Sequence, residues 1–112
     1  MILSKKLTKH YKWGADCEGW IFASNDTQTM ILERMPPHTR EQRHYHKYAK
    51  QLFFIIQGTA VIEIDGEAFI LHEQEAIEIE KGLPHQIVNN SGEDIVFFVI
   101  SQPPTVNDRY LV

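Results

Sequence analysis

The chain is a succession of short β-like runs separated by turn residues, and no segment shows helical periodicity over three turns. In the segment 59–65, apolar and polar residues alternate with a period of two, which is typical of a strand with one buried face. This segment ends at Asp65-Gly66, a dipeptide that favours a two-residue hairpin turn. About nine strands are predicted in this way, over 18–24, 29–35, 43–48, 51–57, 59–65, 68–71, 76–80, 85–89 and 95–100. The pattern predicts an all-β sandwich or barrel with antiparallel pairing.

The length of the chain indicates the number of domains, and its charge indicates which classes of partner are excluded. The 112 residues fit one domain, with a core barrel over about 18–101, an N-terminal lead-in over 1–17 and a C-terminal tail over 102–112. The net charge of −4 is mild and no Lys/Arg cluster occurs, so neither nucleic-acid nor membrane-surface binding is expected. The longest apolar run is far too short to span a bilayer. With Cys17 as the only cysteine, a reducing, cytoplasmic setting is expected.

Two histidines in a β-like run are the first sign of a metal site. His44 and His46 lie two residues apart, so both side chains point to the same face, with Cα atoms about 6.5–7 Å apart. Imidazoles at this spacing can lean onto one ion at about 2.0–2.1 Å. A pair alone does not close a stable site, and two ordinary strand histidines are the alternative. Gln51 and His85 each open a later apolar strand that could lie beside the first in a barrel.

Two spaced motifs carry a family resemblance. The first places residues in the spacing G-x5-H-x-H-x3,4-E-x6-G, occupied here by His38, His44, His46, Gln51 and Gly58. The second follows G-x5-P-x-G-x2-H-x3-N, occupied here by Gln74, Glu80, Gly82, His85 and Asn89. Both resemble the motifs of the cupin superfamily over roughly residues 35–100. The resemblance implies a double-stranded antiparallel β-helix, or jelly roll. It also implies one divalent ion (Zn, Fe, Mn or Ni) held by His44, His46, Gln51 and His85.

The departures from the motifs bear on turns and on chemistry. His38 replaces a turn glycine, at a cost of about 1 kcal/mol if the backbone there needs a positive φ. Gln74 and Glu80 replace the glycine and the proline of the second motif, which changes turn chemistry rather than ligands. Gln51 replaces a glutamate, and a neutral carboxamide leaves the charge of the ion uncompensated, which favours a Lewis acid over a redox centre. The resemblance also implies that glutamine ligands occur in some cupin sugar isomerases and uronate ring-opening enzymes. The latter have an aspartate on the last barrel strand, and residues 95–101 contain none.

Glu33 is the candidate catalytic residue. It shares the strand face of Ile31 and Met35, so an interior face would make it a carboxylate near the ion and a general base. If Met30 and Leu32 fill the core instead, Glu33 is an exposed or salt-bridged side chain.

The predicted function is that of a metal-dependent isomerase or lyase acting on a small polar molecule that resembles a sugar or a keto acid. Two alternatives stay open, a metal-dependent dioxygenase and a non-enzymatic module that captures a small ligand. The resemblance implies a homodimer, which an open sheet edge also favours. In the tail, Asp108 and Arg109 are candidates for an intersubunit ion pair, to which no function is assigned because exposed pairs contribute little.

Overall fold

The computed structural model describes all 112 residues and contains twelve strands and no helix. None of its segments is therefore a helix that could cross a bilayer. The strands are β1 (Lys9–Trp13), β2 (Cys17–Ser24), β3 (Thr29–Met35), β4 (Thr39–Arg40), β5 (His44–Tyr45), β6 (Lys50–Gln57), β7 (Ala60–Ile64), β8 (Glu67–Leu71), β9 (Ala76–Ile79), β10 (His85–Asn89), β11 (Ile95–Gln102) and β12 (Tyr110–Leu111).

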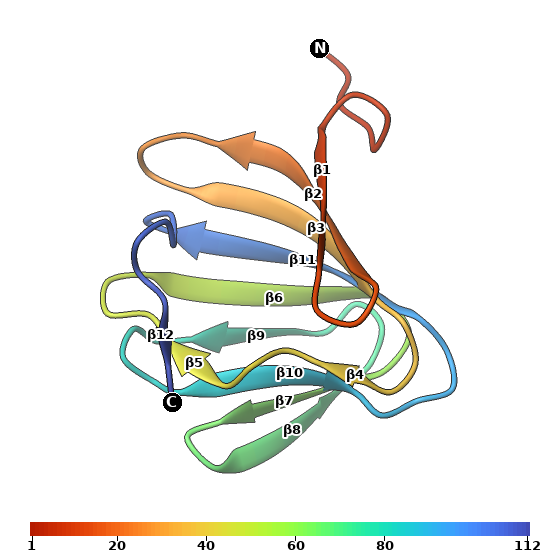
Figure 1. Cartoon of the computed structure of the whole chain (residues 1–112), viewed down its shortest axis with the longest axis vertical. Coiled ribbons are helices and arrows are strands. Elements are labelled where there is room, and N and C mark those ends of the chain that lie inside the picture. The colour runs from red at the N-terminus through yellow and green to blue at the C-terminus, as the bar shows by residue number, and fades with distance from the viewer.

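Two antiparallel sheets form the molecule (Figure 1). The first has the order β1-β2-β3-β11-β6-β9, and the second has the order β12-β5-β10-β7-β8, with β4 also paired to β10. Strands that are distant in sequence lie side by side, as β3 with β11 and β5 with β10. Along the sequence the chain passes repeatedly from one sheet to the other, as from β5 to β6 and from β10 to β11. This connectivity is that of a jelly roll, so the predicted all-β, double-stranded antiparallel β-helix is confirmed.

Eight of the nine predicted segments form strands within a few residues of the expected bounds. The ninth, 43–48, is strand only at His44–Tyr45, because the chain bends at Lys47 and Tyr48. Three strands were not predicted. Strands β4 and β12 have two residues each, which is too short for an alternation. β1 reads KHYKW, in which only Tyr11 and Trp13 alternate with polar residues. β1 extends the first sheet and β12 the second, so both terminal segments join the sheets.

The inner faces of the two sheets supply one core. Facing pairs such as Met35 with Ile95 and Phe53 with Val99 point inward from neighbouring strands. Twelve buried residues form the cluster: Cys17, Met35, Phe53, Ile55, Ala60, Ile62, Leu71, Ile79, Ile87, Ile95, Phe97 and Val99. Eight polar residues are also buried, and six of them surround the candidate site: His44, His46, Gln51, His85, Ser101 and Asp108. The other two, Thr39 and Asn89, pair with each other at the opposite end of β10.

The turns keep the backbone geometry that the motifs imply. Asp65 and Gly66 both have positive φ, 51° and 91°, as a two-residue hairpin turn requires. His38 and Gln74 also have positive φ, 60° and 66°, so these positions keep the glycine conformation without the glycine. At Gly58, with φ of 84°, an added Cβ would lie 2.7 Å from the carbonyl oxygen of Asp94, so only glycine fits there without strain.

Candidate metal centre

Three histidines meet inside the barrel. His44 on β5 lies directly opposite His85 on β10, and His46 follows two residues later on the same face. Each side chain is buried, and one ring nitrogen from each lies within 4.8 Å of the others. Small rotations would bring three such atoms onto one cation. The predicted convergence of these three histidines is confirmed.

Main-chain carbonyls fix the orientation of all three rings. The Nδ1 atom of His44 lies 2.7 Å from the carbonyl oxygen of Gln42, and that of His85 lies 2.9 Å from the carbonyl of Leu83. The Nδ1 atom of His46 lies 2.6 Å from the carbonyl of Asp108. A carbonyl only accepts, so each Nδ1 carries the hydrogen and each Nε2 keeps a free lone pair. Metal-binding imidazoles show this arrangement behind the ligand atom.

The Nε2 atoms of His46 and His85 are the candidate ligand atoms. The Nε2 atom of His46 is buried and makes no hydrogen bond. The Nε2 atom of His85 lies 3.2 Å from Oε1 of Gln51, whose amide nitrogen donates to the hydroxyl of Ser101 at 2.9 Å. With its hydrogen on Nδ1, His85 presents the lone pair of Nε2 beside the carboxamide oxygen of Gln51, as two ligand atoms of one cation would lie. The residues therefore fit a divalent metal ion, with Gln51 positioned beside the histidines as predicted.

Burial keeps the imidazoles in the form that binds metal. Desolvation lowers the pKa of His44 to about 3, and it also lowers the pKa of His85. Both rings are neutral at neutral pH, so metal binding there needs no proton release.

The C-terminal segment is part of the site, a role that was not assigned to it from the sequence, and the intersubunit ion pair stays a prediction. The Asp108 carboxylate accepts hydrogen bonds from the backbone N–H groups of Lys47, Tyr48 and Ala49 at 2.7–3.1 Å. The same residue offers its carbonyl to His46, so it clasps the loop that carries this histidine. Burial alone would raise the pKa of Asp108, but the three amide hydrogen bonds lower it.

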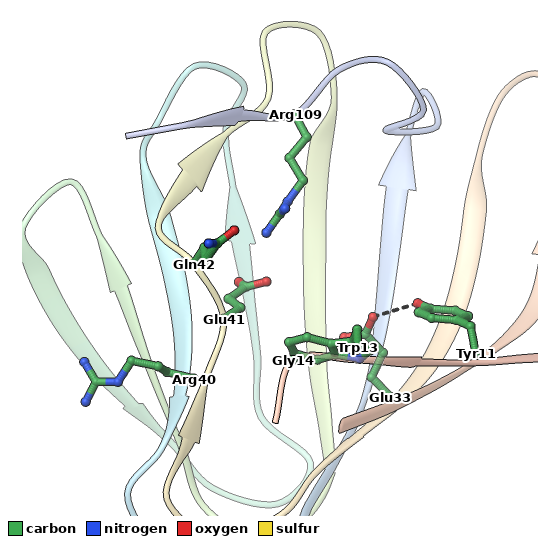
Figure 2. A pocket seen from close by; sticks show the side chains of 8 residues that line it. All are labelled: Tyr11, Trp13, Gly14, Glu33, Arg40, Glu41, Gln42 and Arg109. Carbon is green, nitrogen blue, oxygen red and sulfur yellow. Dashed lines mark hydrogen bonds between the residues drawn. The ribbon is translucent and has the colours of Figure 1, made fainter. Parts of the chain in front are cut away.

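A cavity of about 610 Å³ is shown with its lining side chains in Figure 2. Its lining residues are Tyr11, Trp13, Gly14, Glu33, Arg40, Glu41, Gln42 and Arg109. An inner recess of about 140 Å³ lies between this cavity and the histidines. Its lining includes Glu33, Glu41 and Arg109 from the cavity and His44, His46 and Gln51 from the candidate metal centre. In Figure 2, Arg109 reaches down toward Glu41, whereas Arg40 points away from the cavity.

Glu33 faces the interior, as the catalytic hypothesis required. It pairs directly with Phe97, which is fully buried, and facing residues of adjacent strands point to the same side. The hydroxyl of Tyr11 donates a hydrogen bond of 3.0 Å to its carboxylate. The Tyr11 ring lies over Gly19, where any Cβ would overlap it. Leu32, on the opposite face of β3, is also buried, so both faces of this strand are covered.

The charged groups of the cavity perturb one another. Burial raises the pKa of Glu33 to about 7. Burial and the charge of Glu33 together raise the pKa of Glu41 to about 8. Arg109 forms no ion pair with any carboxylate, although its Nη2 atom lies 3.5 Å from Nδ1 of His44. The cavity thus holds a guanidinium group without an anion.

Sequence reasoning missed Glu41 and Arg109. Glu41 lies between β4 and β5, where strand alternation breaks and parity gives no guide to direction. Arg109 lies in a short tail without a recognisable pattern, so only the pairing of β12 with β5 brings it to the histidines. No signal in a single sequence reports that pairing.

Comparison with known proteins agrees with this geometry. Residues 31–101 match the family model described as "Cupin domain". The polyketide synthase CurC of Streptomyces cyaneus is 29% identical over 65 residues, and the tetracenomycin polyketide synthase protein TcmJ of Streptomyces glaucescens is 33% identical over 46 residues. The matches cover 58% and 41% of this chain, but only 42% and 31% of those proteins, so the chain spans less than half of either relative.

Solved structures share the fold at low identity. KdgF from Halomonas sp. has a TM-score of 0.79 at 17% identity, with 86% of each chain covered. A predicted oxalate decarboxylase from Thermotoga maritima has a TM-score of 0.84 at 16% identity, covering 93% of this chain and all of the other. A sugar phosphate isomerase from Silicibacter pomeroyi has a TM-score of 0.79 at 16% identity, covering 93% and 76%. With a family model matching well over half of its residues, the chain belongs to the cupin domain family.

Proposed function

We propose that this cupin is a metal-dependent enzyme of the isomerase or lyase class, acting on a small keto acid or acidic sugar. The observation that carries the proposal is the unpartnered, buried Nε2 atom of His46 in a cluster of three histidines whose ring nitrogens lie within 4.8 Å of one another. Groups that can handle protons and anions line the same cavity. Proteins of the same fold are described as a sugar phosphate isomerase and as a predicted oxalate decarboxylase.

The ligand set in this proposal is His44, His46, His85 and Gln51. A divalent ion held there supplies Lewis acidity that polarises a carbonyl or hydroxyl oxygen of the substrate. All four ligands are neutral, so the ion keeps its full charge, which favours polarisation over redox tuning.

Glu33 serves as the general base. Its pKa of about 7 leaves a large ionised fraction at neutral pH, together with enough basicity to take a proton from a carbon next to a polarised carbonyl. The hydrogen bond from Tyr11 holds one carboxylate oxygen, and the other is free for the substrate.

Arg109 serves as the anchor for a substrate anion. A guanidinium group binds a carboxylate through two parallel hydrogen bonds, and Arg109 has no such partner within the protein. Because Glu33 and Glu41 also line the cavity, a singly charged carboxylate is repelled less than a doubly charged phosphate. The cavity of about 610 Å³ suits a molecule of a few carbon atoms up to a hexose.

Elemental analysis of protein purified without added chelator tests the metal site. We expect close to one equivalent of a transition metal in the wild type and a large loss in the double variant His44→Ala/His46→Ala. The variant His72→Ala is the matched control, because His72 is exposed and away from the site. Equal metal content in the wild type and the double variant would refute the site.

Turnover separates the proposed chemistry from its alternatives. Metal-loaded protein is incubated in D2O with a panel of keto acids and uronates, and carbon-bound deuterium is followed by NMR. We expect deuterium uptake that is lost in Glu33→Gln. Oxygen consumption without exchange would favour a dioxygenase, and binding without either reaction would favour a ligand-binding module.

A further inference from the structure

The second carboxylate of the cavity, on Glu41, comes from the opposite wall to Glu33. Glu33 lies on β3 in the first sheet. Glu41 lies between β4 and β5, and its backbone N–H donates to the carbonyl of Ile87 on β10, which belongs to the second sheet. Both side chains line the outer cavity and the inner recess next to the histidines (Figure 2).

Each carboxylate is anchored to its own wall by one oxygen. Oε1 of Glu33 accepts the hydroxyl of Tyr11 at 3.0 Å, and Oε1 of Glu41 accepts the backbone N–H of Ile87 at 3.1 Å. The second oxygen of each group makes no hydrogen bond and is not sealed from the cavity. Neither group forms an ion pair. Anchoring orients the carboxylates, and the free oxygens face the space that a substrate would occupy.

A purely structural role does not account for this Glu41. Asparagine, serine or water could satisfy one backbone N–H group at a strand end without placing a charge beside Glu33. Two carboxylates in one water-poor cavity disfavour each other's ionisation, so they hold one proton more readily than none. Burial together with the charge of Glu33 raises the pKa of Glu41 to about 8, while burial raises the pKa of Glu33 to about 7.

We propose that Glu33 and Glu41 are an acid–base pair that acts on opposite faces of the bound substrate. This proposal rests on the proposed function and narrows it to reactions in which a proton leaves one face of a carbon and another arrives at the opposite face. Epimerisation next to a carbonyl is the simplest such reaction.

The proton and electron balance is complete within the pair. The Glu33 carboxylate takes the proton as the C–H bond breaks, and the electron pair moves into the adjacent C–C bond while the carbonyl becomes an enolate oxygen. The protonated Glu41 then forms the new C–H bond on the other face and is left as a carboxylate. One proton has been lost and one gained, and the pair has exchanged its protonation states. The reverse reaction uses the same groups in the opposite roles.

Exchange at a prochiral carbon tests the pair directly. The probe is 2-oxobutanoate in D2O, followed by NMR with metal-loaded protein. A two-sided pair replaces both hydrogens at C3, whereas a single base removes and returns hydrogen on one face and replaces only one. We expect both to exchange in the wild type and replacement of the second to slow at least tenfold in Glu41→Gln. The amide of this variant still accepts the Ile87 N–H group, and Glu67→Gln, an exposed position, is the control.

A titration of the metal-free protein provides a readout independent of turnover. The side-chain carboxyl groups are labelled with ¹³C, and the midpoint of Glu41 is compared between the wild type and Glu33→Gln. We expect the midpoint to fall in the variant, because a neutral amide no longer opposes the ionisation of Glu41. An unchanged midpoint of Glu41 in Glu33→Gln would overturn the pair. Exchange of both hydrogens in Glu41→Gln at the wild-type rate would also overturn it. If exchange is lost in Glu33→Gln but unchanged in Glu41→Gln, the proposed function stands and only the pair is refuted.

Discussion

Replacing Asp108 by alanine should separate the stability of the loop from the affinity of the metal centre. The Asp108 side chain accepts three backbone N–H groups, and the residue is only 5% exposed. Lys47 and Tyr48 are exposed, so water can replace the carboxylate at their amides, whereas Ala49 is 2% exposed and its amide stays buried. Counting about 1 kcal/mol for each hydrated amide and about 1–3 kcal/mol for the buried one gives a loss of about 3–5 kcal/mol.

Urea unfolding of the metal-free protein measures this loss, which corresponds to a fall in Tm of about 10 °C or more. The stabilisation belongs to the ionised carboxylate, whose pKa is lowered by folding. It is therefore fully present above the unfolded pKa of about 3.9 and is lost as the pH falls through the folded value. The difference between wild type and variant should accordingly be constant from pH 6 to 8 and shrink in acid.

Metal affinity is the second readout for this variant. The Asp108 carbonyl holds Nδ1 of His46, so release of the loop should weaken metal binding by about 10–100-fold in a competition assay with a coloured chelator. Asp108→Asn is the conservative comparison, because its amide oxygen can accept part of the same hydrogen bonds. A variant that is destabilised as expected but binds metal with wild-type affinity would refute the clasp.

Three further results are expected. Gly58→Ala should destabilise the protein by about 1–3 kcal/mol, because the new Cβ meets the Asp94 carbonyl at positive φ, whereas Gly92→Ala, with open space around it, should change the urea midpoint little. Glu33→Gln should stabilise the metal-free protein by about 1–3 kcal/mol at pH 8 and not at pH 4. Folding raises the pKa of Glu33 from 4.5 to about 7, so the stability of the wild type falls as the pH rises from 4.5 to 7. Equal urea midpoints at pH 8 would contradict this. Gly19→Ala should displace the Tyr11 ring and break its hydrogen bond to Glu33, detectable as a changed Tyr11 ring environment by NMR, and an unchanged ring signal would contradict it.

The strands and the histidine cluster could be predicted because both depend on local spacing. Alternation with a period of two marks β7 and β9, and the i, i+2 placement of His44 and His46 sets them on one face whatever the rest of the fold does. The positive φ at His38 agrees with the family resemblance, because the motif has glycine at that position.

The parts that could not be predicted depend on non-local pairing. The inward direction of Glu33 follows from its register with Phe97, which lies 64 positions away in the chain. Glu41 lies where the regular strand is interrupted, so parity does not apply to it. The contribution of Arg109 requires the docking of β12 on β5, and a two-residue strand has no periodicity. The expected homodimer stays a prediction.

The carbonyl acceptors behind the three imidazoles bear on how this centre tolerates mutation. Every amino acid brings the same peptide oxygen, so the groups that orient His44 and His85 persist whichever side chains evolution puts at positions 42 and 83. The main-chain path therefore sets the orientation of these ligands, and substitutions at positions 42 and 83 should change it little. Position 108 is different, because there a side chain holds the peptide in place, and it is where we expect that robustness to end.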